Sequence, residues 1–138
     1  MPELRGQQDI GETRVIMRQE LLQTIFEGAR RLYPKESILL LRGKRRKELI
    51  EITDLLIPPL ATYGHGFAHI PLHFLPMDFS IVGTVHSHPS GNFKPSNADL
   101  NHFFGKILMI VAFPFQDQAH AAVYGRLGQK LALEITDA

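Results

Sequence analysis

Two histidines, a serine and an aspartate follow one another within a short stretch of this sequence, at His86, His88, Ser96 and Asp99. The residues around the histidines alternate as in a strand, which predicts that both imidazoles project from the same face. Pro89 cannot donate to a strand ladder and is expected to end that strand, and Ser96 is expected to open a helix. Two imidazoles and one carboxylate suit zinc and leave a fourth coordination position for water. An open position of this kind indicates catalysis.

Each half of this pattern also has a purely structural interpretation. A His-x-His pair at a strand end occurs by chance, and Ser-x-x-Asp after a proline is a common helix start. In that helix start Ser96 caps the helix and Asp99 accepts from the exposed amides. The two halves together are more specific than either one alone. The capping role is compatible with catalysis, because a helix N-terminus would hold both side chains beside the histidines.

Proton transfer requires one more group. A metal lowers the pKa of a bound water to about 7, but it does not carry protons from that water to a leaving group. A nearby carboxylate is needed, and Glu36 is the candidate in this sequence. It lies where a turn leads into an apolar segment that is predicted to be a buried strand. By position alone, a solvated turn residue is the more common situation for a glutamate.

The chain as a whole is that of an ordinary globular protein. Its 138 residues fit one domain, and 44% of them are apolar and 21% charged. The net charge of +1 does not indicate an overall electrostatic attraction to nucleic acid, and the sequence has no polybasic membrane anchor. The absence of cysteine excludes disulfides, thiolate zinc sites and a thiol nucleophile.

No apolar leader and no run of membrane-spanning length is present in the sequence. We therefore expect a cytoplasmic protein with neither a nucleic-acid nor a membrane partner. Residues 1–11 are polar and unpatterned, and they are predicted to form a loose tail. Residues 12–138 are then the folded domain.

The hydrophobic pattern predicts the elements that must position these side chains. Strands are expected at 13–17, 36–41, 49–57, 80–86, 107–113, 120–124 and 130–135, with hairpin turns at 43–47 and 125–128. Helices are expected at 21–32 and 97–104. Residues 58–79 are predicted to be an irregular insertion with one short helix near Leu72. This order indicates an α/β (α+β) single domain with a mixed β-sheet flanked by helices.

The remaining histidines give weaker signals. His65, His69 and His73 are spaced four apart and would form a metal-binding stripe on a helix, but glycine and proline between them argue against a continuous helix. His102 follows the aspartate by three residues and is expected to be a partly exposed polar residue rather than a partner of the site. His120 begins a predicted strand and carries no functional signal.

The spacing of Glu36, His86, His88, Ser96 and Asp99 resembles the signature of the JAMM (MPN+) metalloprotease family. That signature is Glu, His-x-His, seven residues, Ser, two residues and Asp, and seven residues also separate the second histidine from the serine here. The resemblance extends into the flanking segments, Tyr33 to Gly43 and Gly83 to Val85. Compact size and the lack of cysteine resemble the stand-alone prokaryotic (archaeal) members of the family.

The resemblance implies a cytidine-deaminase-like αβα sandwich that binds one Zn²⁺ through His86, His88 and Asp99. It further implies that Glu36 is the general base and that Ser96 hydrogen-bonds the oxyanion. The implied substrates are isopeptide or peptide bonds that follow the C-terminal Gly-Gly of ubiquitin-like (SAMP-like) modifiers. A protein of this kind would be a deubiquitinase-like isopeptidase, or desampylase.

Two alternatives stay open beside this hypothesis. The same chemistry could trim a sulfur-carrier protein or a small-peptide conjugate. A non-catalytic binding module could instead keep the fold and use the motif only structurally. Metal analysis separates the binding module from the enzymes, and a comparison of lysine-linked with linear substrates separates the two enzymes.

Overall fold

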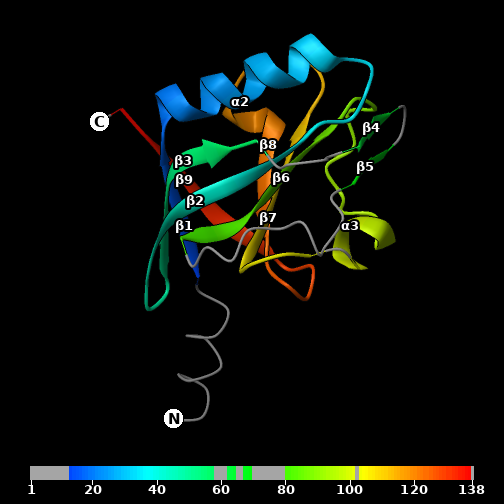
Figure 1. Cartoon of the computed structure of the whole chain (residues 1–138). Helices are drawn as coiled ribbons and strands as arrows, with labels where there is room; N and C mark the ends of the chain where they lie inside the picture. The colour runs from blue at the N-terminus through cyan, green and yellow to red at the C-terminus, as the bar shows by residue number, and fades with distance from the viewer. Residues whose placement is uncertain (1–12, 58–61, 65–66, 70–79, 102, 138) are drawn as a thin grey trace.

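A mixed sheet of seven strands closes on itself into a barrel (Figure 1). The computed structural model describes residues 13–57, 62–64, 67–69, 80–101 and 103–137. Around the barrel the order is β1, β3, β2, β6, β7, β8, β9, and β1 closes the ring by pairing in parallel with both β3 and β9. The bounds are β1 Arg14–Arg18, β2 Ile38–Arg46, β3 Leu49–Leu56, β6 Ile81–His88, β7 Ile107–Ala112, β8 Ala121–Tyr124 and β9 Lys130–Thr136.

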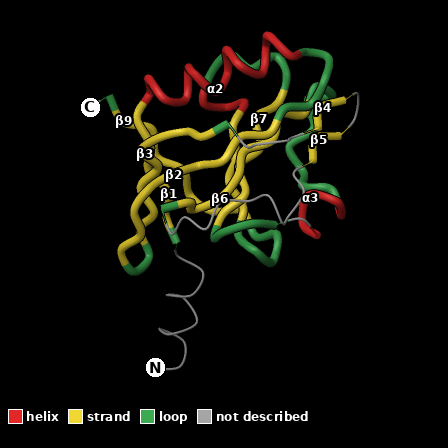
Figure 2. The backbone as a smooth tube through the Cα atoms, in the orientation of Figure 1, coloured by secondary structure: helices red, strands yellow, loops and turns green. Residues whose placement is uncertain are grey.

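One long helix, α2 (Gln19–Leu32), lies across the barrel at the top of Figures 1 and 2. It buries Leu22, Ile25, Phe26 and Ala29, which recur at helical spacing and therefore form one apolar face. The helix ends at Leu32, because Tyr33 precedes a proline and is held in an extended conformation. The shorter elements are α3 (Asn97–Asn101), η2 (Gln118–His120), β4 (Thr62–Gly64) and β5 (Phe67–His69).

Strand β6 is buried along its whole length because it pairs with β2 on one side and β7 on the other. Its two faces meet different apolar clusters. Val85 packs into the large core beneath α2, and we call this side of β6 the core face. His86 pairs with Ile38 and Ile110, which belong to separate clusters, and Ile110 packs with Leu100 near α3. We call this second side the site face.

The predicted elements that fall within the described residues are present, and the mixed sheet in a single α/β domain is confirmed. Several boundaries were wrong. Strand β2 continues to Arg46 rather than ending at residue 41, and the turn of its hairpin with β3 is Lys47-Glu48 rather than 43–47. Gly43 lies at an irregularity within the strand, where a Cβ would collide with the carbonyl of Glu51. Its glycine reflects close strand approach, not a turn.

Other expectations need correction or stay open. The irregular insertion at 58–79 contains a small antiparallel pair, β4 with β5. The second helix ends at Asn101 rather than continuing to residue 104. The αβα sandwich is not confirmed, because the described sheet closes into a barrel with one long helix across it. The tail at 1–11 and the helix near Leu72 lie outside the described residues.

Within the described ranges, no helix has both the length and the apolar character needed to cross a bilayer. The expected cytoplasmic location stays a prediction.

Candidate metal and catalytic site

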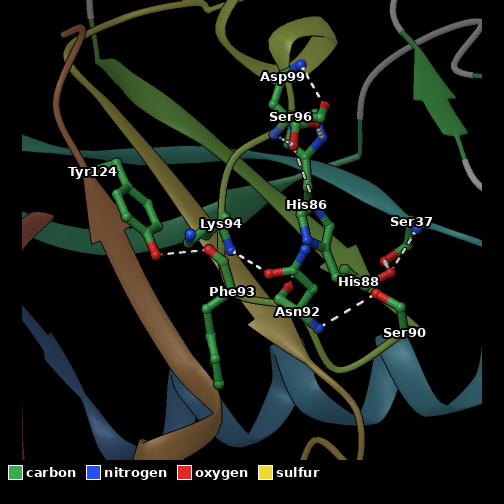
Figure 3. A network of polar contacts seen from close by, with 11 residues as sticks. Ser37, His86, His88, Ser90, Asn92, Phe93, Lys94, Ser96, Asp99 and Tyr124 are labelled. Atoms are coloured by element: carbon green, nitrogen blue, oxygen red, sulfur yellow. Dashed lines mark hydrogen bonds and ion pairs between the residues drawn. The ribbon is translucent and has the colours of Figure 1, made fainter. Parts of the chain in front are cut away.

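The site face of β6 brings two imidazoles onto one carboxylate (Figure 3). Nδ1 of His86 lies 3.3 Å from Oδ1 of Asp99, and Nε2 of His88 lies 3.2 Å from Oδ2 of the same carboxylate. The three residues are 3%, 7% and 8% exposed, respectively. The strand therefore supplies both nitrogens, and α3 supplies the oxygens that face them.

The carboxylate is held by the start of α3. The amide of Ser96 donates to Oδ2 of Asp99 at 2.8 Å, and the amide of Asp99 donates to Oγ of Ser96 at 3.0 Å. This reciprocal pair is the helix start that the Ser-x-x-Asp spacing predicts. The same two bonds that begin the helix therefore fix the direction of the carboxylate toward the histidines.

Both ring nitrogens of His88 face oxygen acceptors. Nδ1 lies 2.7 Å from the carbonyl of Asn92, while Nε2 faces Asp99. Only the doubly protonated imidazolium donates in both directions. Burial alone would lower the pKa of His88, but the hydrogen bonds to the carboxylate and to the carbonyl outweigh it and raise that pKa.

The other two members of this group are coupled to it. Burial by itself would raise the pKa of Asp99, but the two histidines and the amide of Ser96 stabilise the carboxylate and hold that pKa well below its usual range. Nδ1 of His86 is close to Asp99 without the alignment of a hydrogen bond, and it is a buried polar atom with no hydrogen-bond partner. Such an atom is costly unless something else binds it.

Glu36 lies in the segment between α2 and β2, two residues before the strand begins. It is half-buried, and burial raises its pKa. Asp99 raises that pKa further, whereas His88 and His86 lower it. These influences place Glu36 within electrostatic range of the group at the end of β6, and its catalytic role stays a prediction.

The donor set fits a zinc ion chemically. Zinc prefers imidazole nitrogens and carboxylate oxygens, and a metal cation replaces the proton on a ligating nitrogen. Such an ion would give Nδ1 of His86 a partner and would take the place of the proton between His88 and Asp99. As they stand, however, no three His, Asp or Glu side chains among the described residues have the arrangement of a complete metal site. The predicted ligands and the single zinc stay predictions.

Several residues that support the site escaped the sequence analysis. Tyr124 donates to the carbonyl of Phe93, beside the Asn92 carbonyl that faces His88. Ser87 contacts Ser37, next to Glu36. A serine between two site histidines is a signal that sequence inspection could have used. The carbonyl of Asn92 and the distant Tyr124 carry no such signal.

The structure describes two of the histidines outside the motif, His69 and His120. His69 lies in strand β5, so it belongs to no helix with His65 and His73, which lie outside the described residues, as does His102. His120 has a local structural role that the sequence analysis missed, because it forms a capping box with Asp117 in η2.

Comparisons with known proteins agree with this geometry. The family model for prokaryotic homologs of the JAB domain matches residues 18–126. A probable metalloprotease of Haloferax volcanii is 30% identical over 126 residues, which cover 86% of this chain and 78% of that relative.

Solved structures give the same result. A JAB1/MPN domain protein from Archaeoglobus fulgidus is 36% identical with a TM-score of 0.64, covering 88% of this chain and 97% of that one. A structure described as "JAMM: a metalloprotease-like zinc site in the proteasome and signalosome" is 32% identical with a TM-score of 0.61, covering 91% and 98%. A Desulfitobacterium hafniense protein, 14% identical with a TM-score of 0.58 over 90% and 94%, shares the fold.

These matches define a metalloprotease-type domain. The chain belongs to the JAMM/MPN family.

Proposed function

We propose that residues 12–138 form a zinc-dependent isopeptidase or peptidase that cleaves after the C-terminal Gly-Gly of ubiquitin-like (SAMP-like) modifiers. The observation that carries the proposal is the pair of buried imidazoles on β6 that converge on the carboxylate of Asp99. The family relatives named above support a metal-dependent peptidase. A cytidine-deaminase-like fold and a cytoplasmic location complete the proposal.

The proposed metal ligands are His86, His88 and Asp99. When bound, zinc would supply Lewis acidity that polarises the scissile carbonyl and acidifies the attacking water. Glu36 would accept the proton from that water and deliver it to the leaving lysine amine. Its raised pKa suits a group that must both take and release a proton near neutral pH.

Ser96 would donate a hydrogen bond to the oxyanion. Its Oγ already accepts the amide of Asp99, and this bond leaves the hydroxyl hydrogen available for donation. Ser96 is exposed, so a substrate carbonyl can reach it. Removing one such donor in other enzymes costs about 3–4 kcal/mol of transition-state stabilisation.

The preference for a diglycine tail has a steric rationale. The histidines and Asp99 are almost completely buried, so a scissile carbonyl must enter a confined space to approach them. Residues without side chains fit such a space, whereas bulky neighbours would hold the carbonyl away. The ubiquitin-like substrate class itself is supported by the family resemblance.

The test is incubation of the zinc-loaded protein with a ubiquitin-like protein linked to a lysine side chain. The same modifier extended by a linear peptide, and a sulfur-carrier protein extended in the same way, are tested in parallel. We expect cleavage after Gly-Gly, fastest for the lysine linkage. Preferential cleavage of the carrier protein would favour the alternative substrate class, and absence of all cleavage by zinc-loaded protein would overturn the proposal.

The variant Glu36→Gln provides the matched control for chemistry. It should bind zinc normally and lose roughly 10²–10⁴-fold in kcat, the usual contribution of a general base. Glu20→Gln, at an exposed position on α2, should leave kcat unchanged. Retained turnover in Glu36→Gln would remove this residue from the mechanism.

A further inference from the structure

Ser87, the residue between the two site histidines, is clamped to Ser37. Its Oγ accepts from the amide of Ser37 at 2.7 Å and from the hydroxyl of Ser37 at 3.0 Å. In return, the amide of Ser87 donates to the carbonyl of Ser37 at 3.0 Å. Ser87 is 1% exposed and Ser37 is half-buried, so these bonds are partly shielded from water. Figure 3 shows Ser37 beside His88.

The clamp extends the pairing of β2 with β6 by one residue. The last registered pair of the two strands at this end is Ile38 with His86, and Ser37 with Ser87 follows it. Side chains alternate along a strand, so Ser87 lies on the core face while His86 and His88 lie on the site face. The same alternation on the opposing segment puts Glu36 on the side of Ile38, which is the site face.

We propose that Ser87 is the positioning residue for Glu36, because its hydroxyl fixes the backbone that directs the carboxylate of Glu36 toward His88. This inference rests on the proposed function. The segment before β2 has no strand partner beyond Ser37 in the described register, and the clamp supplies the bond that keeps it extended. A general base must stay within hydrogen-bonding reach of the proton it takes, so a drifting backbone would reduce kcat.

Three variants of the zinc-loaded protein test this inference. Ser87→Ala removes the acceptor, Ser87→Thr keeps a hydroxyl at the same position, and Ser37→Ala removes one of the two bonds to it. The substrate is a ubiquitin-like protein that carries a lysine-linked fluorescent peptide.

We expect Ser87→Ala to lower kcat by about tenfold or more, with KM and the zinc dissociation constant changed by less than about twofold. Ser87→Thr should restore most of the activity, and Ser37→Ala should lower kcat by roughly two- to fivefold. A wild-type kcat in Ser87→Ala would overturn the proposal. So would a loss of zinc affinity as large as the loss of kcat, because Ser87 would then act on the ligand strand. If Ser87→Ala does not fold, an unchanged kcat in Ser37→Ala overturns the proposal by itself.

A second readout does not depend on activity. The amide of Ser37 should lose protection from hydrogen exchange in Ser87→Ala, and the carboxyl ¹³C signal of Glu36 should shift. Both signals should stay close to wild type in Ser87→Thr. Unchanged signals in Ser87→Ala would overturn the inference even if the conjugate is cleaved. If wild-type protein cleaves no conjugate, the proposed function fails and these signals still decide whether Ser87 positions Glu36.

Discussion

The hydroxyl of Tyr124 donates to the carbonyl of Phe93 across a distance of 2.6 Å. Phe93 follows Asn92, whose own carbonyl faces Nδ1 of His88. Strand β8 thus contacts, through Tyr124, the loop that follows β6, and this loop in turn contacts His88 (Figure 3). Burial raises the pKa of Tyr124, so its hydroxyl keeps the proton that it donates throughout the physiological pH range. A residue far from the motif therefore helps to set the orientation of an imidazole in the site.

The variant Tyr124→Phe keeps the ring and removes only this hydrogen bond. We expect the free energy of unfolding to fall by about 1 kcal/mol, as is typical for one intramolecular hydrogen bond. Zinc affinity should weaken by roughly tenfold, because the acceptor of His88 is no longer fixed. Chemical denaturation and competitive zinc titration measure the two effects. Tyr33→Phe is the matched control, and equal zinc affinities for the two variants would contradict the expectation.

The variant His88→Ala removes one proposed ligand and leaves the carboxylate of Asp99 without its closest cation. We expect stoichiometric zinc to be lost on dialysis, as measured by elemental analysis. His120→Ala, which alters a histidine in the capping box of η2, should retain zinc. Unchanged zinc content in His88→Ala would show that the proposed ligand set is incorrect.

The variant Ser96→Ala separates the two roles of that serine. Loss of the cap should lower the free energy of unfolding by about 1 kcal/mol. Loss of the oxyanion donor should lower kcat by roughly 10²–10³-fold. Zinc should still bind, because the amide of Ser96 continues to donate to Asp99. Ser96→Thr retains a hydroxyl and should recover both quantities, so a thermal melt and a kcat measurement on the two variants decide the matter.

The pairing of His88 with Asp99 predicts a pH dependence for EDTA-treated protein. The folded-state pKa of Asp99 lies below 3.8, so its stabilising contribution is present above that pH and is lost as the pH falls through the folded value. The folded-state pKa of His88 lies above 6.5, so its contribution is complete below that pH and is lost as the pH rises through the folded value.

The free energy of unfolding should therefore be highest between about pH 4 and about pH 6.5. Denaturation with guanidinium at a series of pH values measures it. In Asp99→Asn the contribution of the ion pair should disappear, and the curve should flatten across this window. The same maximum in the variant would show that other groups cause it. Zinc affinity should fall as the pH drops, because the metal competes with the proton on Nε2 of His88.

Local sequence patterns were sufficient to predict most of the elements. The helix to residue 32 followed from its apolar periodicity, and the strand before Pro89 followed from alternation and from the proline itself. The length of β2 did not follow, because Lys44, Arg45 and Arg46 are exposed while their backbone still pairs with β3. Hydrophobic patterning indicates which residues are buried, but it does not indicate where exposed residues continue a strand through backbone hydrogen bonds.

Closure of the barrel could not be predicted in the same way. It depends on Arg14 pairing with both Leu49 and Ala132, and these contacts join distant parts of the chain. The candidate side chains of the site were easier to propose from the sequence than the closure of the barrel, because few residue types can bind a metal or transfer a proton. The groups that support these side chains were harder to predict: the carbonyl of Asn92 is a backbone group, and every residue type carries one.

The site is built from two elements that are held in the fold to different degrees. His86 and His88 belong to a strand that is bonded on both sides, whereas Asp99 belongs to a helix of five residues joined to that strand by a single loop. The imidazole nitrogens of His86 and His88 thus belong to the central sheet, whereas the carboxylate oxygens of Asp99 belong to a short helix outside it. Grafting experiments can exploit this asymmetry, provided that an exchanged loop keeps the carbonyl of Asn92, which faces His88, and the carbonyl of Phe93, which accepts from Tyr124.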